Sequence, residues 1–167
     1  RAMGGLSGRA PRLAAALGNK GGVCLVRYEV WQPEFDLSDR ADYGQTLEPV
    51  VLRHGLGVVN YYSLASGCRA GKYRSKEDGQ QSKRGENVIK TYLNERGLKI
   101  LDALDKVANA HNVGVTQISL AWLMAQESIT APIVSATSLE QLTDLINATQ
   151  LELTDEEVKA LTDASAY

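Results

Sequence analysis

Residues 58–73 read VVNYYSLASGCRAGKY, an apolar run that ends in an aromatic ring, a hydroxyl, two glycines and a lysine. Such a turn can bind an anion, because glycines let backbone N–H groups approach phosphate oxygens closely. Ser63 can donate a hydrogen bond, and Lys72 can supply the opposing charge. Tyr62, just before the turn, can stack on a flat ring. This stretch therefore predicts a strand that leads into a phosphate cradle.

Short apolar runs alternate with longer amphipathic ones on both sides of this stretch, which is the signature of parallel β/α units. The predicted strands are residues 1–7, 24–32, 56–62 and 129–134. The predicted helices are residues 11–17, 45–54, 97–111 and 116–126, and two more follow the capping sequences at Ser138 and Thr154. A chain of 167 residues is long enough for one domain with its own core, so we expect a single domain over residues 1–167.

The longest connection follows the predicted cradle and runs from residue 63 to about residue 95. It contains a polar, locally basic segment, residues 74–90. Loops of this length are usually functional or disordered. We therefore expect a long mobile loop over residues 74–95.

The charge balance excludes some classes of partner. The chain has 18 Lys plus Arg against 20 Asp plus Glu, a net charge of -2, which argues against a general affinity for nucleic acid or acidic membranes. No apolar run reaches the ~20 residues that span a bilayer, so no membrane insertion is expected. Cys24 and Cys68 lack Cys-x-x-Cys spacing, which favours a reduced, cytoplasmic chain. His54 and His111 each lie near a helix end, and no metal site is expected.

Polar or stacking side chains follow the predicted strands, where parallel β/α proteins bind ligands. They are Ser7, Gln32, Tyr62, Ser63, Ser135 and Thr137. None is an obvious acid, base or nucleophile, so this edge predicts binding without catalysis. The helix that begins at Ser138 adds a second anion signal, because helix N-termini present free N–H groups. Alternatives stay open: strand-end packing for Tyr62 and Ser63, a solvated Lys72, and helix capping by Ser135 and Thr137.

Five separated motifs in this order make the chain resemble the carboxyl-terminal half of the aldo-keto reductases. The resemblance is strongest to the branch that includes the β subunits of potassium channels. The motifs are RAMGGLS at residues 1–7, QPEF at 32–35, SLASG with GKY at 63–73, AWL at 121–123, and PIVSATS with EQL at 132–142. The resemblance implies an α/β fold that forms strands five to eight, with their helices, of an eight-stranded TIM-type barrel.

The resemblance also implies a cofactor, NADP(H), bound at the strand ends, and hydride transfer to a small-molecule carbonyl substrate. Ser7 and Gln32 would hold the nicotinamide carboxamide, and Tyr62 would stack on the nicotinamide ring. The residues implied at the pyrophosphate are Ser63, Leu64, Gly67 and Lys72. Those implied at the 2′-phosphate and adenosine are Ser135, Thr137 and Gln141.

Three positions depart from the family's pattern. Gly8 stands where Asn is usual beside the first-strand Ser. Residues 68–70, Cys-Arg-Ala, replace the usual Phe-Leu-Thr and exchange apolar packing for a charge. Gln141 replaces a frequent Arg, which should lower the preference for a 2′-phosphate because a neutral amide cannot form a bidentate charged pair.

The family's catalytic Asp, Tyr, Lys and His lie in the first half of the barrel and have no counterpart in these 167 residues. We therefore expect no catalytic residue here and no hydride transfer by the isolated chain. Another protein segment or a second copy would complete the barrel, because an open set of strands leaves unpaired edges. The alternatives are a non-catalytic NADP(H)-binding or regulatory subunit and a degenerate fragment.

Overall fold

The computed structural model describes residues 29–81 and 85–167. The predicted strand at residues 1–7 and the predicted helix at residues 11–17 lie outside the described residues, and so do Ser7, Gly8 and Cys24.

The strands of the described part form one parallel sheet. They are β1 (Val30–Trp31), β2 (Gly57–Asn60) and β3 (Ala131–Pro132), in the order β1-β2-β3. Val30 pairs with Gly57, and Val59 pairs with Ala131. Neighbouring strands are thus consecutive along the chain, as parallel β/α units require. The predicted α/β class is confirmed, while the assignment to one half of a barrel stays a prediction.

The strands are shorter than the sequence predicts, and prolines explain part of the difference. Pro33 follows β1 closely and has no N–H group, so regular pairing with β2 stops there. It resumes only as a single bridge between Glu34 and Tyr61. Pro132 limits β3 in the same way.

The helix between β1 and β2 ends where the sequence predicts. α2 (Glu48–His54) follows one turn of π-helix, η1 (Tyr43–Leu47). Gly55 ends α2 in the left-handed conformation with φ 59°, and its N–H donates to the carbonyl oxygen of Leu52 at 3.2 Å. A side chain would be strained at this φ, which is why glycine suits the position.

The expected long loop after β2 consists largely of short helices. They are the 3₁₀ helices η2 (Ala65–Ala70) and η3 (Lys76–Gln81) and the α-helix α3 (Gly85–Tyr92). Gly85 and Gly79 bring η3 and α3 into contact, because a Cβ atom on Gly85 would overlap the Gly79 carbonyl group. The polar composition of this segment therefore reflects short amphipathic helices at the surface. Its mobility stays a prediction.

The remaining helices are α4 (Glu95–His111), α5 (Val115–Met124), α6 (Leu139–Ala148) and α7 (Asp155–Ala164). Three of the four, α4, α6 and α7, begin at a side-chain cap, whereas α5 begins after Gly114 without one. α4 begins two residues earlier than predicted, because the Asn94 side chain accepts a hydrogen bond from the N–H of Gly97. Thr154 and Glu157 form the predicted reciprocal capping box of α7.

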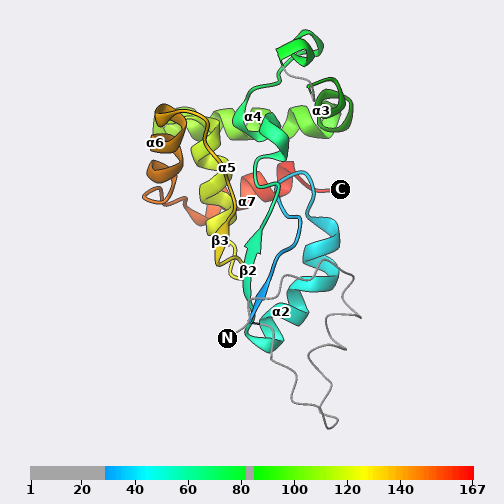
Figure 1. Ribbon diagram of the computed structural model, residues 1–167, viewed down its shortest axis with the longest axis vertical. Helices are drawn as coiled ribbons and strands as arrows, with labels where there is room; N and C mark the ends of the chain where they lie inside the picture. Colours follow the sequence, from blue (N-terminus) through cyan, green and yellow to red (C-terminus); the bar gives the residue numbers. More distant parts are fainter. Residues whose placement is uncertain (1–28, 82–84) are drawn as a thin grey trace.

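The core centres on α5, which lies between α4 and α6 and contacts β3. Trp122 of α5 is fully buried, and its ring stacks on Phe35 with centroids 5.6 Å apart. Its indole N–H donates to the Thr162 hydroxyl of α7 at 3.0 Å. In Figure 1, α5 and α6 lie on one side of the short strands and α2 lies on the other. Within the described residues, no helix combines the length and apolar character needed to cross a bilayer.

Candidate functional site

A groove of about 640 Å³ opens where β2 and β3 end. Its walls come from the turn after β2, from η2, from the residues after β3 and from the facing side of α6. The lining residues are Tyr62, Ser63, Leu64, Ser66, Gly67, Ala70, Lys72, Thr116, Ile133, Val134, Ser135, Gln141, Asp144 and Leu145. The groove therefore joins both anion signals of the sequence, which are some 70 residues apart.

The turn after β2 has an unusual backbone. Tyr62, Ala65 and Ser66 have φ values of 60°, 46° and 54°, and the glycines 67 and 71 have φ values of 96° and 72°. These left-handed residues bend the chain into a compact turn, in which the N–H groups of Ala65, Gly67 and Lys72 donate to carbonyl oxygens of the same turn. We call residues 62–72 the cradle. Gly67 is needed here because its φ is strained for any residue with a Cβ atom.

Ser63 anchors the cradle to the sheet. Its hydroxyl donates to the carbonyl oxygen of Ile133 at 2.9 Å and accepts from the side-chain amide of Asn60 at 3.1 Å. That amide also donates to the Phe35 carbonyl oxygen at 2.7 Å. Ser63 is 2% exposed, so its hydroxyl already holds internal partners. Ser63 lines the groove and fixes the turn through these bonds, while its predicted contact with a pyrophosphate stays a prediction.

Tyr62 and Lys72 lie at the rim of the groove. Tyr62 is 47% exposed, and its ring meets the Tyr61 ring edge-on with centroids 5.7 Å apart. An exposed ring in this position offers a face for stacking. The Lys72 ammonium group lies 5.5 Å from the centre of the Tyr73 ring, and its stem runs beside Gly67. Lys72, the last residue of the cradle, is the cation among the lining residues.

The opposite wall is the start of α6. Ser138 caps this helix by accepting from the N–H of Gln141 at 3.2 Å. The Gln141 side-chain oxygen turns back and accepts from the N–H and the hydroxyl of Thr137, at 2.8 Å and 3.0 Å. The predicted capping box is therefore half formed, because this amide binds Thr137 instead of Ser138. Ser135 is exposed and faces the groove.

Seven predicted residues thus line one groove: Tyr62, Ser63, Leu64, Gly67, Lys72, Ser135 and Gln141. Thr137 joins them through its bonds to Gln141. Gln32 is exposed beside β1 and is not among the residues of this groove, and Ser7 lies outside the described residues. The cofactor-binding roles that the resemblance implies for these residues, Gln32 and Ser7 included, stay predictions.

Sequence reasoning missed three polar side chains of the groove: Ser66, Thr116 and Asp144. Asp144 had a usable signal, because it lies three residues after Gln141 and so on the same face of α6. Thr116 had none, since only the packing of α5 against η2 brings it to the groove.

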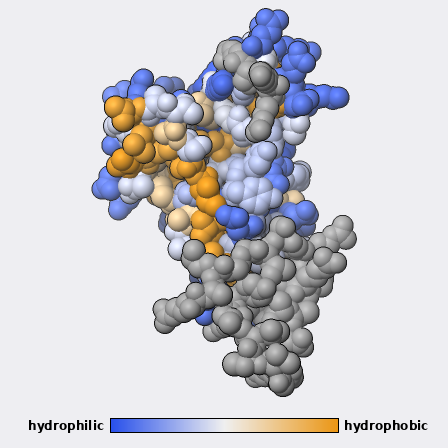
Figure 2. All heavy atoms as spheres, in the orientation of Figure 1, coloured by the Kyte–Doolittle hydropathy of each residue, from blue (hydrophilic) through white to orange (hydrophobic). Residues whose placement is uncertain are grey.

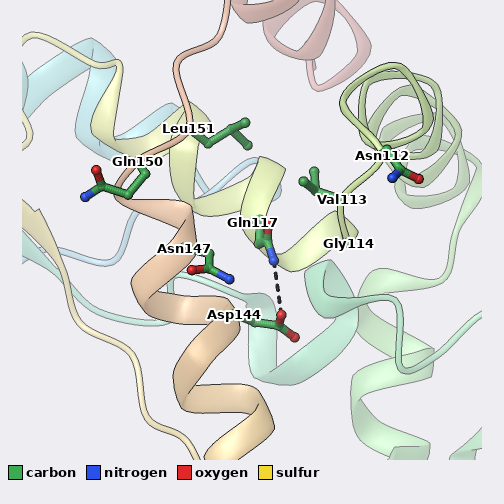
Figure 3. Close-up of a pocket in the computed structure, with 8 residues that line it drawn as sticks. All are labelled: Asn112, Val113, Gly114, Gln117, Asp144, Asn147, Gln150 and Leu151. Carbon is green, nitrogen blue, oxygen red and sulfur yellow. Dashed lines mark hydrogen bonds between the residues drawn. The ribbon is translucent and has the colours of Figure 1, made fainter.

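Asp144 also belongs to a second, polar cavity of about 590 Å³ between α4, α5 and α6. Figure 3 shows its carboxylate accepting a hydrogen bond from the side-chain amide of Gln117, at 3.0 Å. Most of the other lining side chains are exposed amides, namely Asn112, Asn147 and Gln150. Asp144 therefore forms a wall between the two cavities.

Two residues of the replaced segment 68–70, Cys68 and Arg69, are buried away from the groove, whereas Ala70 lines it. Cys68 and Arg69 are 0% and 1% exposed. Burial raises the pKa of the Cys68 thiol, which disfavours the reactive thiolate form. The charge of Arg69 is thus inside the protein, where its bonds to Ser38 and Gly97 replace the apolar packing usual in the family.

Candidate metal ligands do not gather in the described part of the chain. Over residues 29–81 and 85–167, no group of three or more His, Cys, Asp or Glu side chains is placed to hold a metal ion.

A parallel β/α sheet with a ligand groove at the carboxyl ends of its strands defines the architectural class of this protein. Comparison with protein families is more specific. Residues 5–166 match the aldo/keto reductase family, and the chain belongs to that family. The predicted recognition is thereby confirmed.

Curated relatives give the same picture. The chain is 30% identical to norsolorinic acid reductase B of Aspergillus parasiticus over 148 residues, which cover 86% of this chain and 37% of that protein. It is 28% identical to L-glyceraldehyde 3-phosphate reductase of Escherichia coli, covering 71% of this chain and 36% of that protein. It is 27% identical to a probable voltage-gated potassium channel subunit beta of Oryza sativa, covering 74% and 39%.

Among solved structures, a thermostable aldo-keto reductase in complex with the inhibitor epalrestat superposes with a TM-score of 0.61. Its sequence is 22% identical, so this likeness concerns the fold alone. The match covers 83% of this chain and 40% of the other. The chain thus spans about two fifths of the length of each of these four relatives.

Proposed function

We propose that this chain forms the NADP(H)-binding part of an aldo-keto reductase, an oxidoreductase that interconverts carbonyl compounds and alcohols. The observation that carries the proposal is the groove that joins the cradle to the start of α6. An anion-binding turn, an exposed aromatic ring and a helix N-terminus line one cavity, as a ligand with phosphates and a flat ring requires.

The residues fit such a dinucleotide in order along the groove. Tyr62 would stack on the nicotinamide ring, the cradle with Lys72 would take the pyrophosphate, and Ser135, Thr137 and Gln141 would face the adenosine end. Bound nicotinamide would supply or accept the hydride. The chain's own residues would hold and orient the cofactor.

Titration of the 167-residue chain with NADPH tests this proposal, followed by calorimetry. We expect saturable binding well below ~1 mM, since that dissociation constant corresponds to only about 4 kcal/mol. Lys72→Met should weaken binding about tenfold by removing a charge beside the pyrophosphate. Lys106→Met, an exposed site on α4, is the matched control and should not change it. No saturable binding, or equal effects of the two variants, would contradict the proposal.

A parallel titration with NADH tests the cofactor preference. Gln141 offers a neutral amide to the 2′-phosphate, so we expect the ratio of the two affinities to be modest, about tenfold or less in favour of NADPH. Gln141→Arg should raise that ratio, because a guanidinium group can pair with a phosphate in bidentate fashion.

The 167-residue chain by itself should show no turnover of a carbonyl substrate, because the family's catalytic Asp, Tyr, Lys and His have no counterpart in its sequence. We propose that another protein segment or a second copy completes the barrel. Turnover of NADPH by the purified chain alone would contradict this. Binding without turnover after mixing with the first half of a family barrel would favour a non-catalytic subunit instead.

A further inference from the structure

The cradle is held in a conformation that its own residues do not favour. Ala65 and Ser66 both have left-handed φ values, 46° and 54°. For a residue with a Cβ atom this conformation costs roughly 1–2 kcal/mol. Such strain persists only where surrounding contacts determine the backbone. Polar anchors should therefore be found behind the cradle.

Two buried side chains supply these anchors. Ser63 ties one end of the cradle to β3, through the carbonyl oxygen of Ile133. Arg69 ties the other end to the helices. Its guanidinium group donates to the Ser38 hydroxyl at 2.8 Å and to the Gly97 carbonyl oxygen at 3.1 Å, and its own carbonyl oxygen accepts from the Ser119 hydroxyl at 2.9 Å.

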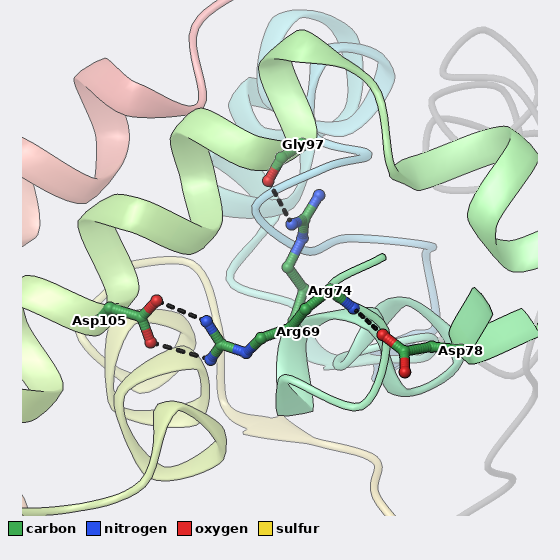
Figure 4. Close-up of polar contacts among 5 residues, drawn as sticks. All are labelled: Arg69, Arg74, Asp78, Gly97 and Asp105. Atoms are coloured by element: carbon green, nitrogen blue, oxygen red, sulfur yellow. Dashed lines mark hydrogen bonds and ion pairs between the residues drawn. The ribbon is translucent and has the colours of Figure 1, made fainter. Parts of the chain in front are cut away.

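Arg69 is not placed to bind a phosphate directly. It is 1% exposed, and Figure 4 shows its guanidinium group turned to the first turn of α4, at Gly97. The neighbouring Arg74 pairs with both carboxylate oxygens of Asp105. Lys72 remains the cation of the cradle that lines the groove. Arg69 can therefore affect a bound anion only by holding the backbone of the cradle in place.

We propose that Arg69 is a positioning residue of the cradle: it clamps η2 to Ser38 and to α4, and so keeps the turn in its phosphate-binding shape. The inference rests on the proposed function for its ligand. The hydrogen bonds of Arg69 to Ser38 and Gly97 are present without any ligand. They also give a role to a position where the family usually has an apolar side chain.

The variant Arg69→Met removes the hydrogen-bond donors and keeps most of the side-chain length. The matched control is Arg96→Met. Arg96 is also partly buried, and its guanidinium group lies 3.9 Å from the Tyr167 ring centre. It donates to the carbonyl oxygens of Ser38, Leu37 and Ser165, and none of these acceptors belongs to the cradle. Both variants should lower the melting temperature, because each loses several charge-assisted hydrogen bonds.

Two measurements separate the variants. In Arg69→Met, the affinity for NADPH should fall at least about tenfold, and amide hydrogen exchange over residues 64–71 should accelerate by a similar factor. Arg96→Met should leave both within about twofold of the unchanged chain. Unchanged exchange in Arg69→Met, or equal effects in Arg96→Met, would overturn the proposal.

Ser38→Ala gives a milder test should Arg69→Met fail to fold. It removes one acceptor of Arg69 and leaves the Ser38 carbonyl oxygen, which holds Arg96 and Tyr167. We expect about threefold weaker binding and faster exchange in the same segment. If the unchanged chain does not bind NADPH, the proposed function fails, whereas exchange over residues 64–71 still decides whether Arg69 holds the cradle.

Discussion

Single residues show where this chain departs from simple expectations, and Asp36 is a clear case. Its side chain is 1% exposed, and one carboxylate oxygen accepts from the N–H groups of Ser38 and Asp39. The other oxygen has no hydrogen-bond partner in the described part of the chain. Burial raises the pKa of Asp36 to about 6, although its bonds to Ser38 and the charge of Arg69 act in the opposite direction.

We predict a pH-dependent stability that Asp36→Asn removes. The folded-state pKa lies above the unfolded value, so the stabilising contribution is complete below about pH 4 and is lost as pH rises through about 6. The loss amounts to about 3 kcal/mol in free energy of unfolding. Urea unfolding of both chains between about pH 4 and pH 8 measures it. Parallel curves for the two chains would show that this pKa is not raised.

Gly97 marks a close backbone approach at the start of α4. A Cβ atom there would overlap the carbonyl group of Tyr92, and glycine is the only residue without one. We predict that Gly97→Ala lowers the free energy of unfolding by about 2–3 kcal/mol. Gly114→Ala is the control, because no atom lies within 4 Å of its Cβ position, and its effect should be under about 1 kcal/mol. Equal effects would contradict the prediction.

At the scale of elements, the C-terminal helix depends on its cap. The Thr154 hydroxyl accepts from the N–H of Glu157 at 3.2 Å, and the Glu157 carboxylate accepts from the N–H of Thr154 at 2.9 Å. The same carboxylate lies 2.8 Å from the His111 ring on α4. The bond from the N–H of Thr154 is the largest cause that holds the pKa of Glu157 below its usual value.

Thr154→Ala should therefore lower the free energy of unfolding by about 1 kcal/mol, because it leaves an N–H group of the first turn without its partner. Thr143→Ala makes the same substitution in the middle of α6, where alanine is the better helix former. That control should be neutral or slightly stabilising. Chemical unfolding of the two variants compares them, and a loss in Thr143→Ala as large as in Thr154→Ala would count against the cap.

At the scale of the whole molecule, an apolar surface lies beside the edge of the sheet. β3 has β2 on one side and, within the described residues, no strand on the other. Figure 2 shows apolar side chains gathered over α6 and β3. The exposed members are Ile133, Leu139, Leu142 and Ile146, and they are 41%, 82%, 46% and 56% exposed. We predict that this surface contacts further protein, because exposed apolar patches are found at protein–protein interfaces.

The proposed completion of the barrel predicts that this surface mediates association. We expect the double variant Leu142→Lys/Ile146→Lys to abolish association, either with a second copy or with the first half of a family barrel. Sedimentation velocity, with and without that half, measures both. Lys106→Glu, on an exposed face of α4, is the control. Association that survives the double variant would place the contact elsewhere.

Local signals predicted the helices better than the strands. α6 and α7 begin at the predicted capping residues, and Gly55 ends α2 as expected, whereas α4 begins two residues before its predicted start. The strands were overestimated because pairing depends on a partner strand, and prolines 33 and 132 interrupt it. The short helices between residues 65 and 92 were missed because they are stabilised by contacts with one another and with α5.

The sequence alone determined the α/β class and the family, because spacing, glycines and capping residues act over a few neighbours. Only the tertiary structure decided which polar groups face the groove. In the folded chain, Arg69 points inward and donates to Ser38 and Gly97. The Ser63 hydroxyl is hydrogen-bonded to Ile133 and Asn60, and Asp144 lines the groove. The physical reason is that the direction of a side chain is set by the packing of elements far apart in the chain, which no local pattern encodes.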